Sequence, residues 1–317
     1  MASLKVPAND PFPAEDAADQ SQGRDPNDES LAIPVLVQVR GLIRKARPDT
    51  YNEDLLKDLD RGRSTEFERA ILLWALDPAE RDAFLAKKAT KLFTSNNWVV
   101  VEIACTRSSF ELFNVKQAYQ ARYKEYLEED VSSHTSGDLR KLLLPLVSTF
   151  RYEGEEVNMM LARSEAKILH DKILEKAYSD DDFIRILTTR SKSQLGATLN
   201  HYKNEYGNAI NKYMQNLKED PKNEYLKLLR AAIKCLTYPE KHFEKLLRLA
   251  INKMGTDEWA LTRVVITRAE VDMDRIKEEY LRRNSIPLDD AIVKVTSGEY
   301  MDHLLILTRH GNAFKTQ

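Results

Sequence analysis

Apolar residues recur along this chain at spacings of three and four, which is the period of a helix with one buried face. The clearest example is the apolar stripe formed by Leu228, Leu229, Ala232, Ile233 and Leu236. Strict alternation of apolar and polar positions, the mark of a half-buried strand, is essentially absent from the sequence. The pattern predicts an all-α protein of short helices with polar connections.

Helix boundaries are marked by recognisable start signals. Asp77-Pro78-Ala79-Glu80 places an acceptor at the N-cap, proline at the first helical position and glutamate to complete a capping box, and Thr237-Tyr238-Pro239-Glu240 repeats this arrangement. The chain holds only 10 Gly and 11 Pro in 317 residues. So few turn residues disfavour a β-sandwich or a glycine-punctuated α/β sheet.

An internal repeat organises the sequence. An apolar stretch ending in Thr-Arg and a small residue occurs three times, with its arginine at Arg107, Arg190 and Arg268. Twelve residues after each arginine comes a tyrosine, and a leucine-rich segment follows; the tyrosines are Tyr119, Tyr202 and Tyr280. Because each arginine holds the same place in its copy, we expect it to make a structural ion pair or to bind carbonyl groups.

An earlier, weaker copy has Tyr51 in the tyrosine slot, so four repeats of about 70 to 80 residues tile the chain. We divide it into a tail (1–14) and repeats 1 to 4, at 15–84, 85–157, 158–244 and 245–317. Repeat 1 is atypical, because residues 16–28 offer no apolar stripe. We expect residues 15–48 to be disordered or restructured.

Charge and cysteine content exclude several classes of function. The 48 Lys+Arg balance 50 Asp+Glu, a net charge of -2, whereas a dedicated nucleic-acid binder is normally basic. Cys105 and Cys235 are too few for a disulfide framework and lack metal-ligand spacing. With neither a signal peptide nor a long apolar window in view, we expect a cytoplasmic protein whose membrane contact is peripheral.

Repeat 4 opens with Gly255-Thr256-Asp257-Glu258 and later carries Thr296-Ser297-Gly298-Glu299. Together with the four-fold repeat, these motifs resemble the annexin family over about residues 50 to 310. The stretches 73–82 and 148–154 look like plant annexins in particular. The resemblance implies five short helices per repeat, a slightly curved disc, and a convex face that meets anionic phospholipid through calcium. It implies no enzymatic activity, and no histidine-centred pair here supports a peroxidase.

Calcium takes six to eight hard oxygen ligands, which a tight loop can supply largely as backbone carbonyls. Carried onto repeat 4, the family pattern gives candidate metal residues at Ile251, Lys253, Gly255, Thr256, Thr296 and Glu299. Lys253 fills a usual glycine slot, and the expected acidic ligand falls on Val295, which offers no side-chain oxygen. Candidate membrane contacts are Lys253, Met254 and Trp259, although helix packing explains the recurrence of Trp98 and Trp259 equally well.

The other repeats depart further from the family's calcium pattern. The position where the family pattern expects an acidic calcium ligand is called the acid slot. In repeat 2 the acid slot is His134, and in repeat 3 it is Leu217, near Glu219 and Asp220. In repeat 1 the acid slot is Gly62, and no glycine-rich loop precedes it. We therefore expect weak calcium binding, confined to repeat 4.

Weaker candidates have plainer explanations. Cys105 and Cys235 match positions proposed as a redox cluster in similar plant proteins, yet buried free thiols are common. Ile184-Arg185-Ile186 resembles a tripeptide proposed to bind actin, although core packing accounts for it. The leading hypothesis is calcium-dependent binding to anionic phospholipid, in stress response or membrane trafficking. The alternative is a calcium-independent helical scaffold with protein partners such as actin or other annexins.

Overall fold

The computed structural model describes residues 65–91, 96–148, 150–216 and 223–310. Within these residues every regular element is an α-helix, and no strand occurs. The predicted all-α class is confirmed. None of the described helices is long and apolar enough to cross a membrane. The hypotheses about residues 15–48, Tyr51 and Gly62 lie outside the described residues.

The described helices form three groups of five, preceded by a single helix of repeat 1. Repeat 1 is represented by α3 (Glu66–Ala75). Repeat 2 contains α4 (Pro78–Ala89), α5 (Asn97–Thr106), α6 (Ser109–Tyr123), α7 (Leu127–His134) and α8 (Gly137–Ser148). Repeat 3 contains α9 (Met159–Leu174), α10 (Asp181–Thr189), α11 (Lys192–Tyr206), α12 (Ile210–Asn216) and α13 (Glu224–Thr237). Repeat 4 contains α14 (Pro239–Asn252), α15 (Glu258–Arg268), α16 (Met273–Asn284), α17 (Leu288–Val293) and α18 (Gly298–His310). The expected five helices per repeat are confirmed for repeats 2 to 4.

The helix ends show which start signals act as predicted. The Asp77 side chain accepts a hydrogen bond from the Ala79 amide and caps α4, whose first residue is Pro78. The Thr237 signal fails, because Thr237 is the last residue of α13 and its hydroxyl donates to the Ile233 carbonyl. The N-cap of α14 is Tyr238, which makes no side-chain capping bond. In helical terms repeats 2 and 4 begin at Pro78 and Pro239, so the boundaries drawn at 84 and 244 fall inside α4 and α14.

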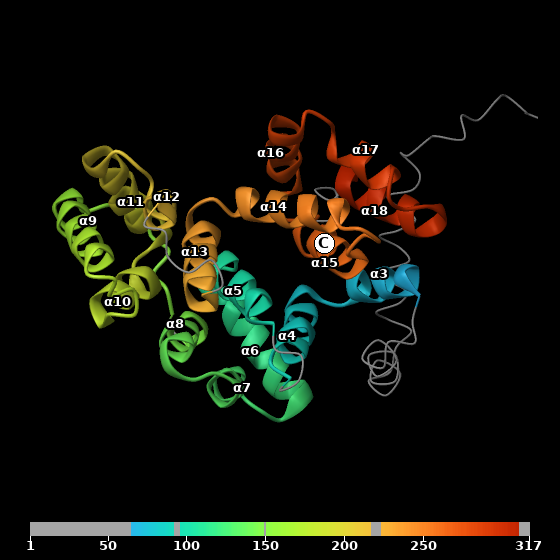
Figure 1. The fold of residues 1–317 in the computed structure, drawn as a ribbon. Helices are drawn as coiled ribbons and strands as arrows, with labels where there is room; N and C mark the ends of the chain where they lie inside the picture. The colour runs from blue at the N-terminus through green and yellow to red at the C-terminus, as the bar shows by residue number, and fades with distance from the viewer. Residues whose placement is uncertain (1–64, 92–95, 149, 217–222, 311–317) are drawn as a thin grey trace, which may run out of the picture.

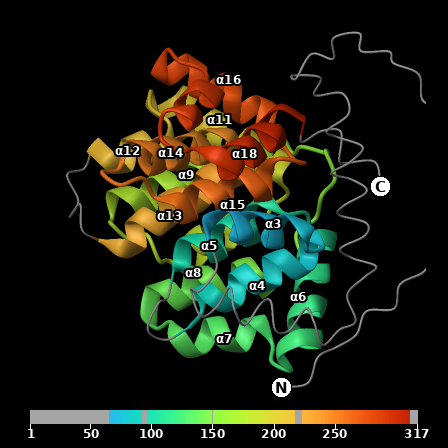
Figure 2. The same ribbon diagram turned by 90° about the vertical axis from the view of Figure 1, so that its right-hand side faces the viewer.

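The repeats lie side by side and share one apolar core (Figure 1). Helix α5 of repeat 2 packs against α13 of repeat 3, and α15 of repeat 4 packs against α3 of repeat 1. Figure 2 shows repeat 4 above repeat 2, a second view of the same arrangement. The recurring tyrosines Tyr119, Tyr202 and Tyr280 are all buried, as is the stripe from Leu228 to Leu236. The repeated positions are therefore mainly core positions.

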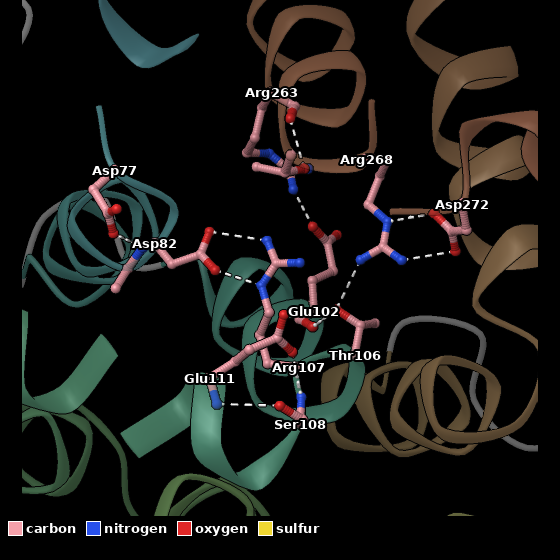
Figure 3. A network of polar contacts seen from close by, with 12 residues as sticks. Asp77, Asp82, Glu102, Thr106, Arg107, Ser108, Glu111, Arg263, Arg268 and Asp272 are labelled. Carbon is pink, nitrogen blue, oxygen red and sulfur yellow. Dashed lines mark hydrogen bonds and ion pairs between the residues drawn. The ribbon is translucent and has the colours of Figure 1, made fainter. Parts of the chain in front are cut away.

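The recurring arginines make ion pairs with carboxylates that have little exposure, which agrees with the structural role expected for them. Arg107 donates two hydrogen bonds to Asp82, and Arg190 donates one to Glu165 at 2.6 Å (Figure 3 shows the first pair). Burial opposes the charge on Arg107, but the carboxylate of Asp82 outweighs it and raises the arginine's pKa. A buried charge that keeps its partner is tolerated, whereas an unpaired one is costly.

A second polar cluster joins repeat 2 to repeat 4. The carboxylate of Glu102 on α5 accepts a hydrogen bond from Arg263 on α15, and its other oxygen lies 3.3 Å from Nε2 of His242 on α14. Arg268 reaches the Thr106 hydroxyl at 3.1 Å, also across this boundary (Figure 3). These contacts fix the angle between the two repeats, because directional bonds permit fewer arrangements than apolar packing does.

Candidate calcium and membrane site

The loop between α14 and α15 has the tight turn that a carbonyl-lined ion site requires. Gly255 has φ +81° and Thr256 has φ 38°, so both residues lie in the left-handed region. The Thr256 amide donates to the Lys253 carbonyl, and the Asp257 amide donates to the Ala250 carbonyl, each at 2.9 Å. Asp257 then caps α15 by accepting from the Ala260 amide at 3.1 Å. The loop is thus closed by its own backbone bonds.

The second candidate loop, between α17 and α18, lies beside the first. The Tyr300 hydroxyl reaches the Thr262 hydroxyl at 2.7 Å and the Glu258 carbonyl at 3.4 Å, which ties the start of α18 to the start of α15. Glu299, next to Tyr300, is exposed in the first turn of α18. The structure therefore brings the two halves of the predicted metal set to one end of repeat 4.

Several of the predicted oxygens already have partners. The Lys253 carbonyl oxygen accepts a hydrogen bond from the Thr256 amide, which leaves its second lone pair for an ion. The Thr296 hydroxyl donates to the Ile292 carbonyl at 2.7 Å. Val295, in the expected acid slot, is partly buried against the core. Backbone carbonyls and the exposed carboxylate of Glu299 remain as the donors that would suit calcium.

A lysine already neutralises the acid nearest to the first loop. Nζ of Lys253 lies 3.1 Å from Oδ2 of Asp257; the lysine side chain is 61% exposed and the aspartate side chain 36%. Burial raises the pKa of Asp257, but the Ala260 amide and Lys253 outweigh this effect, so its pKa lies below the usual range. Among the described residues, no group of three or more His, Cys, Asp or Glu side chains could hold a metal ion. Calcium here would depend on backbone oxygens and compete with the lysine.

The predicted membrane contacts separate into two groups. Met254 is 100% exposed at the tip of the loop, and Lys253 beside it is also exposed. Trp259 instead is partly buried against the core. Nζ of Lys88 lies 4.3 Å from the centroid of its ring, and the Arg69 guanidinium lies 5.6 Å from it. Trp259 therefore makes packing contacts, and its contact with lipid stays a prediction.

The equivalent places in repeats 2 and 3 show other chemistry. His134 in repeat 2 lies 3.1 Å from the Asn97 side-chain oxygen and 2.6 Å from the Asp130 carbonyl. In repeat 3, Asp180 caps α10 and pairs with Lys172 at 3.1 Å. The acid slot of repeat 3, Leu217 with Glu219 and Asp220, lies outside the described residues.

The two cysteines are buried and free. They lie on the adjacent helices α5 and α13. Burial raises the pKa of Cys105 to about 12, and burial with the neighbouring Cys105 raises that of Cys235. Both thiols are therefore protonated at neutral pH, which does not favour redox chemistry. In the proposed actin tripeptide, Ile184 and Ile186 are buried in α10.

Two features of the site were not anticipated from sequence. The bridge made by Tyr300 joins residues about 40 positions apart, and no local pattern announces it. The Lys253–Asp257 pair does carry a signal, because its members are four residues apart and of opposite charge.

A family model described as Annexin matches residues 81–146, 164–232 and 242–307. Annexin D2 from Arabidopsis thaliana is 69% identical over 319 residues, 99% of this chain and 100% of the relative. Annexin Gh1 from Gossypium hirsutum is 61% identical over 315 residues, 98% and 99% of the two chains.

The solved structures that superpose on this chain are also annexins. Annexin III superposes with a TM-score of 0.75 at 33% identity, covering 89% of this chain and 88% of that chain. Chicken annexin V in complex with Zn²⁺ superposes with a TM-score of 0.75 at 30% identity, covering 89% of both chains.

Proposed function

Because this chain belongs to the annexin family, whose members bind anionic phospholipid membranes with calcium, we propose that it binds such membranes through repeat 4. In this proposal a calcium ion bridges backbone carbonyls of the loop at Ile251, Lys253 and Gly255 to a lipid phosphate. The ion joins a mildly acidic protein to an acidic surface, which direct Coulomb attraction would not do. The protein would act as a peripheral, non-enzymatic component at the cytoplasmic face, in stress response or membrane trafficking.

One observation supports this proposal above the others: a left-handed turn at Gly255 and Thr256 carries a fully exposed methionine at its tip. A tight turn of this kind can direct successive carbonyl groups toward one ion, and Met254 can enter the lipid headgroup region. Calcium affinity is expected to be low, since Val295 supplies no oxygen and Lys253 holds a positive charge beside the loop.

The test is co-sedimentation of the full chain with phosphatidylserine vesicles across a calcium titration, with a chelator control. The loop variant is Gly255→Ala, because a side chain at φ +81° strains the turn. The matched control is Gly207→Ala, at φ +75° after α11, where added Cβ atoms likewise meet open space. We expect calcium-dependent pelleting to weaken about tenfold in Gly255→Ala and to persist in the control. Equal weakening in both variants would show that the loop is not the site.

The second candidate function is a calcium-independent scaffold with protein partners such as actin or other annexins. The ion pair between Lys253 and Asp257 favours it, because the lysine ammonium already neutralises the carboxylate beside the loop and would repel a calcium ion. Pelleting that ignores calcium but falls with salt would favour direct contact of basic residues with lipid. An absence of pelleting under every condition would favour the scaffold.

A further inference from the structure

A hollow of about 360 Å³ lies where repeats 2, 3 and 4 meet. Its wall is made by the first half of α11, the junction of α13 and α14, and the end of α5. This volume lies within the range of pockets that bind small molecules. Leu199, Leu236 and Pro239 give the hollow an apolar side, and Lys192, Ser193 and Thr237 give it a polar side. We call it the α11 pocket.

A glycine keeps the α11 pocket open. Gly196 stands in the interior of α11, where glycine costs about 1 kcal/mol relative to alanine. Close packing does not explain it, since a Cβ built at Gly196 meets no heavy atom within 4 Å. A larger side chain there would project into empty space at the pocket wall. The unfavourable residue thus coincides with the cavity.

Lys192 supplies a charge with no directly paired carboxylate, although Glu153 and Glu111 act on it from a longer distance. Its Nζ lies 3.4 Å from the carbonyl oxygens of Thr106 and Arg107, which is long for a hydrogen bond. Within the described part of the chain, no carboxylate lies within ion-pair distance of this nitrogen. Burial lowers the pKa of Lys192. Lys192 also begins α11, whose N-terminal end favours a negative rather than a positive charge.

We propose that the α11 pocket binds a small amphiphilic anion, with a carboxylate or phosphate monoester at Lys192 and Ser193 and a short alkyl chain against Leu199, Leu236 and Pro239. The anion would form the direct ion pair that Lys192 does not make with Glu153 or Glu111. The alkyl chain would occupy the space left by Gly196. One end of the ligand is thus recognised by charge and the other by exclusion of water.

This pocket is separate from the calcium loop of repeat 4. Pro239 at the start of α14 lines the pocket, whereas Asn252 at the end of the same helix leads into the loop. The two ends of this 14-residue helix are about 20 Å apart. A ligand in the pocket therefore does not compete with calcium or with lipid at the loop.

Isothermal titration calorimetry of the full chain with octanoate, octyl phosphate and octan-1-ol tests the proposal. We expect saturable binding of octanoate or octyl phosphate and weaker binding of octan-1-ol. The anion with the higher affinity shows whether the pocket prefers a carboxylate or a phosphate. Gly196→Leu, which fills the pocket, should weaken anion binding about tenfold or more. Asn204→Leu adds the same side chain at an exposed position of α11 that does not line the pocket; it is the matched control and should bind the anion as the unmodified chain does. Lys192→Met should weaken the anions and leave octan-1-ol unchanged.

A second blocking variant guards against misfolding of Gly196→Leu. Asn200→Trp changes an exposed residue of α11 at the pocket wall and should weaken anion binding as Gly196→Leu does. Far-UV circular dichroism and melting temperature establish that each variant is folded. The proposal is overturned if neither anion binds saturably, if both blocking variants bind normally, or if Lys192→Met has no effect on the anions.

Discussion

The guanidinium of Arg268 lies over the ring of Phe243, with its Cζ 4.5 Å from the ring centroid. In repeats 2 and 3 the residue 25 positions before the recurring arginine is a carboxylate, Asp82 or Glu165. Repeat 4 thus presents an aromatic face where the other copies present a negative charge. Arg268 obtains its carboxylate from Asp272 instead, one turn further along the chain, at 2.7 Å.

This difference predicts unequal effects of substitution in the two copies. Asp82→Asn leaves Arg107 buried without its counter-charge and should cost about 3–5 kcal/mol of unfolding free energy. Phe243→Leu removes a cation–π contact but keeps the ion pair of Arg268, so it should cost about 1–2 kcal/mol. Urea denaturation followed by circular dichroism measures both. Equal losses would mean that the carboxylate and the ring contribute alike.

Acid should weaken the junction between repeats 2 and 4 through Glu102. Burial raises the pKa of this carboxyl, but Arg263 and His242 outweigh burial and hold it below the usual value. A carboxyl with a lowered pKa in the folded state stabilises the fold above its unfolded pKa, about 4.3, and loses that contribution as pH falls through its folded pKa. Glu102→Gln should therefore be destabilised at neutral pH.

The pH dependence can be measured as urea midpoints between about pH 6 and pH 3. The difference in urea midpoint between the unmodified chain and Glu102→Gln should become smaller as the pH falls. Glu155→Gln, which changes an exposed glutamate in the segment between α8 and α9, is the control and should follow the unmodified chain. A gap that stays constant with pH would exclude titration of Glu102 as the cause.

The tip of the calcium loop should report membrane contact better than Trp259 does. Met254 is fully exposed, whereas Trp259 is packed beneath Lys88. Trp74 and Trp98 also emit, so each shift is compared with that of Trp259→Phe. Adding Met254→Trp to Trp259→Phe should give a larger blue shift of emission with calcium and phosphatidylserine vesicles than Trp259→Phe gives. The unmodified chain should shift no more than Trp259→Phe does. A clearly larger shift of the unmodified chain than of Trp259→Phe would support Trp259 as a lipid contact.

Both cysteines should resist thiol reagents in the folded protein. Cys105 and Cys235 are buried, and burial raises the pKa of Cys105 to about 12. Labelling with a disulfide reagent at pH 8 should therefore be slow and should accelerate in denaturant, because the reactive thiolate is scarce and shielded. Fast labelling of either residue in native buffer would support the redox hypothesis.

Replacing Val295 should repair the calcium site in part. Val295→Asp puts a carboxylate in the family's acid slot, and we expect calcium affinity to rise about tenfold or more. Since Val295 is partly buried against the core, the change should also lower stability, by about 1–3 kcal/mol. The matched control is Val293→Asp, which adds the same charge at an exposed position of α17. Calorimetry with calcium that shows equal affinities for the two variants would mean that the slot is not a ligand position.

The sequence alone predicted the helical class and the internal repeat, although two of the repeat boundaries drawn from it fall inside α4 and α14. Periodic apolar residues and the recurring Thr-Arg motif predict the helices and the repeats, because both depend on interactions local in the chain. The structural role of Arg107, Arg190 and Arg268 was likewise predicted from their recurrence at one position of the repeat. The Thr237 signal failed because α13 ends at Thr237 and α14 begins only two residues later, and a capping motif does not show to which of two adjacent helices a residue belongs.

Only the tertiary structure decided what those elements do together. Phe243 beneath Arg268, Trp259 beneath Lys88, and the Tyr300 bridge each join residues from separate elements. The open space beside Gly196 likewise exists only where three repeats meet. Such contacts depend on the angle at which helices pack, and that angle is set by the whole core and by no single segment.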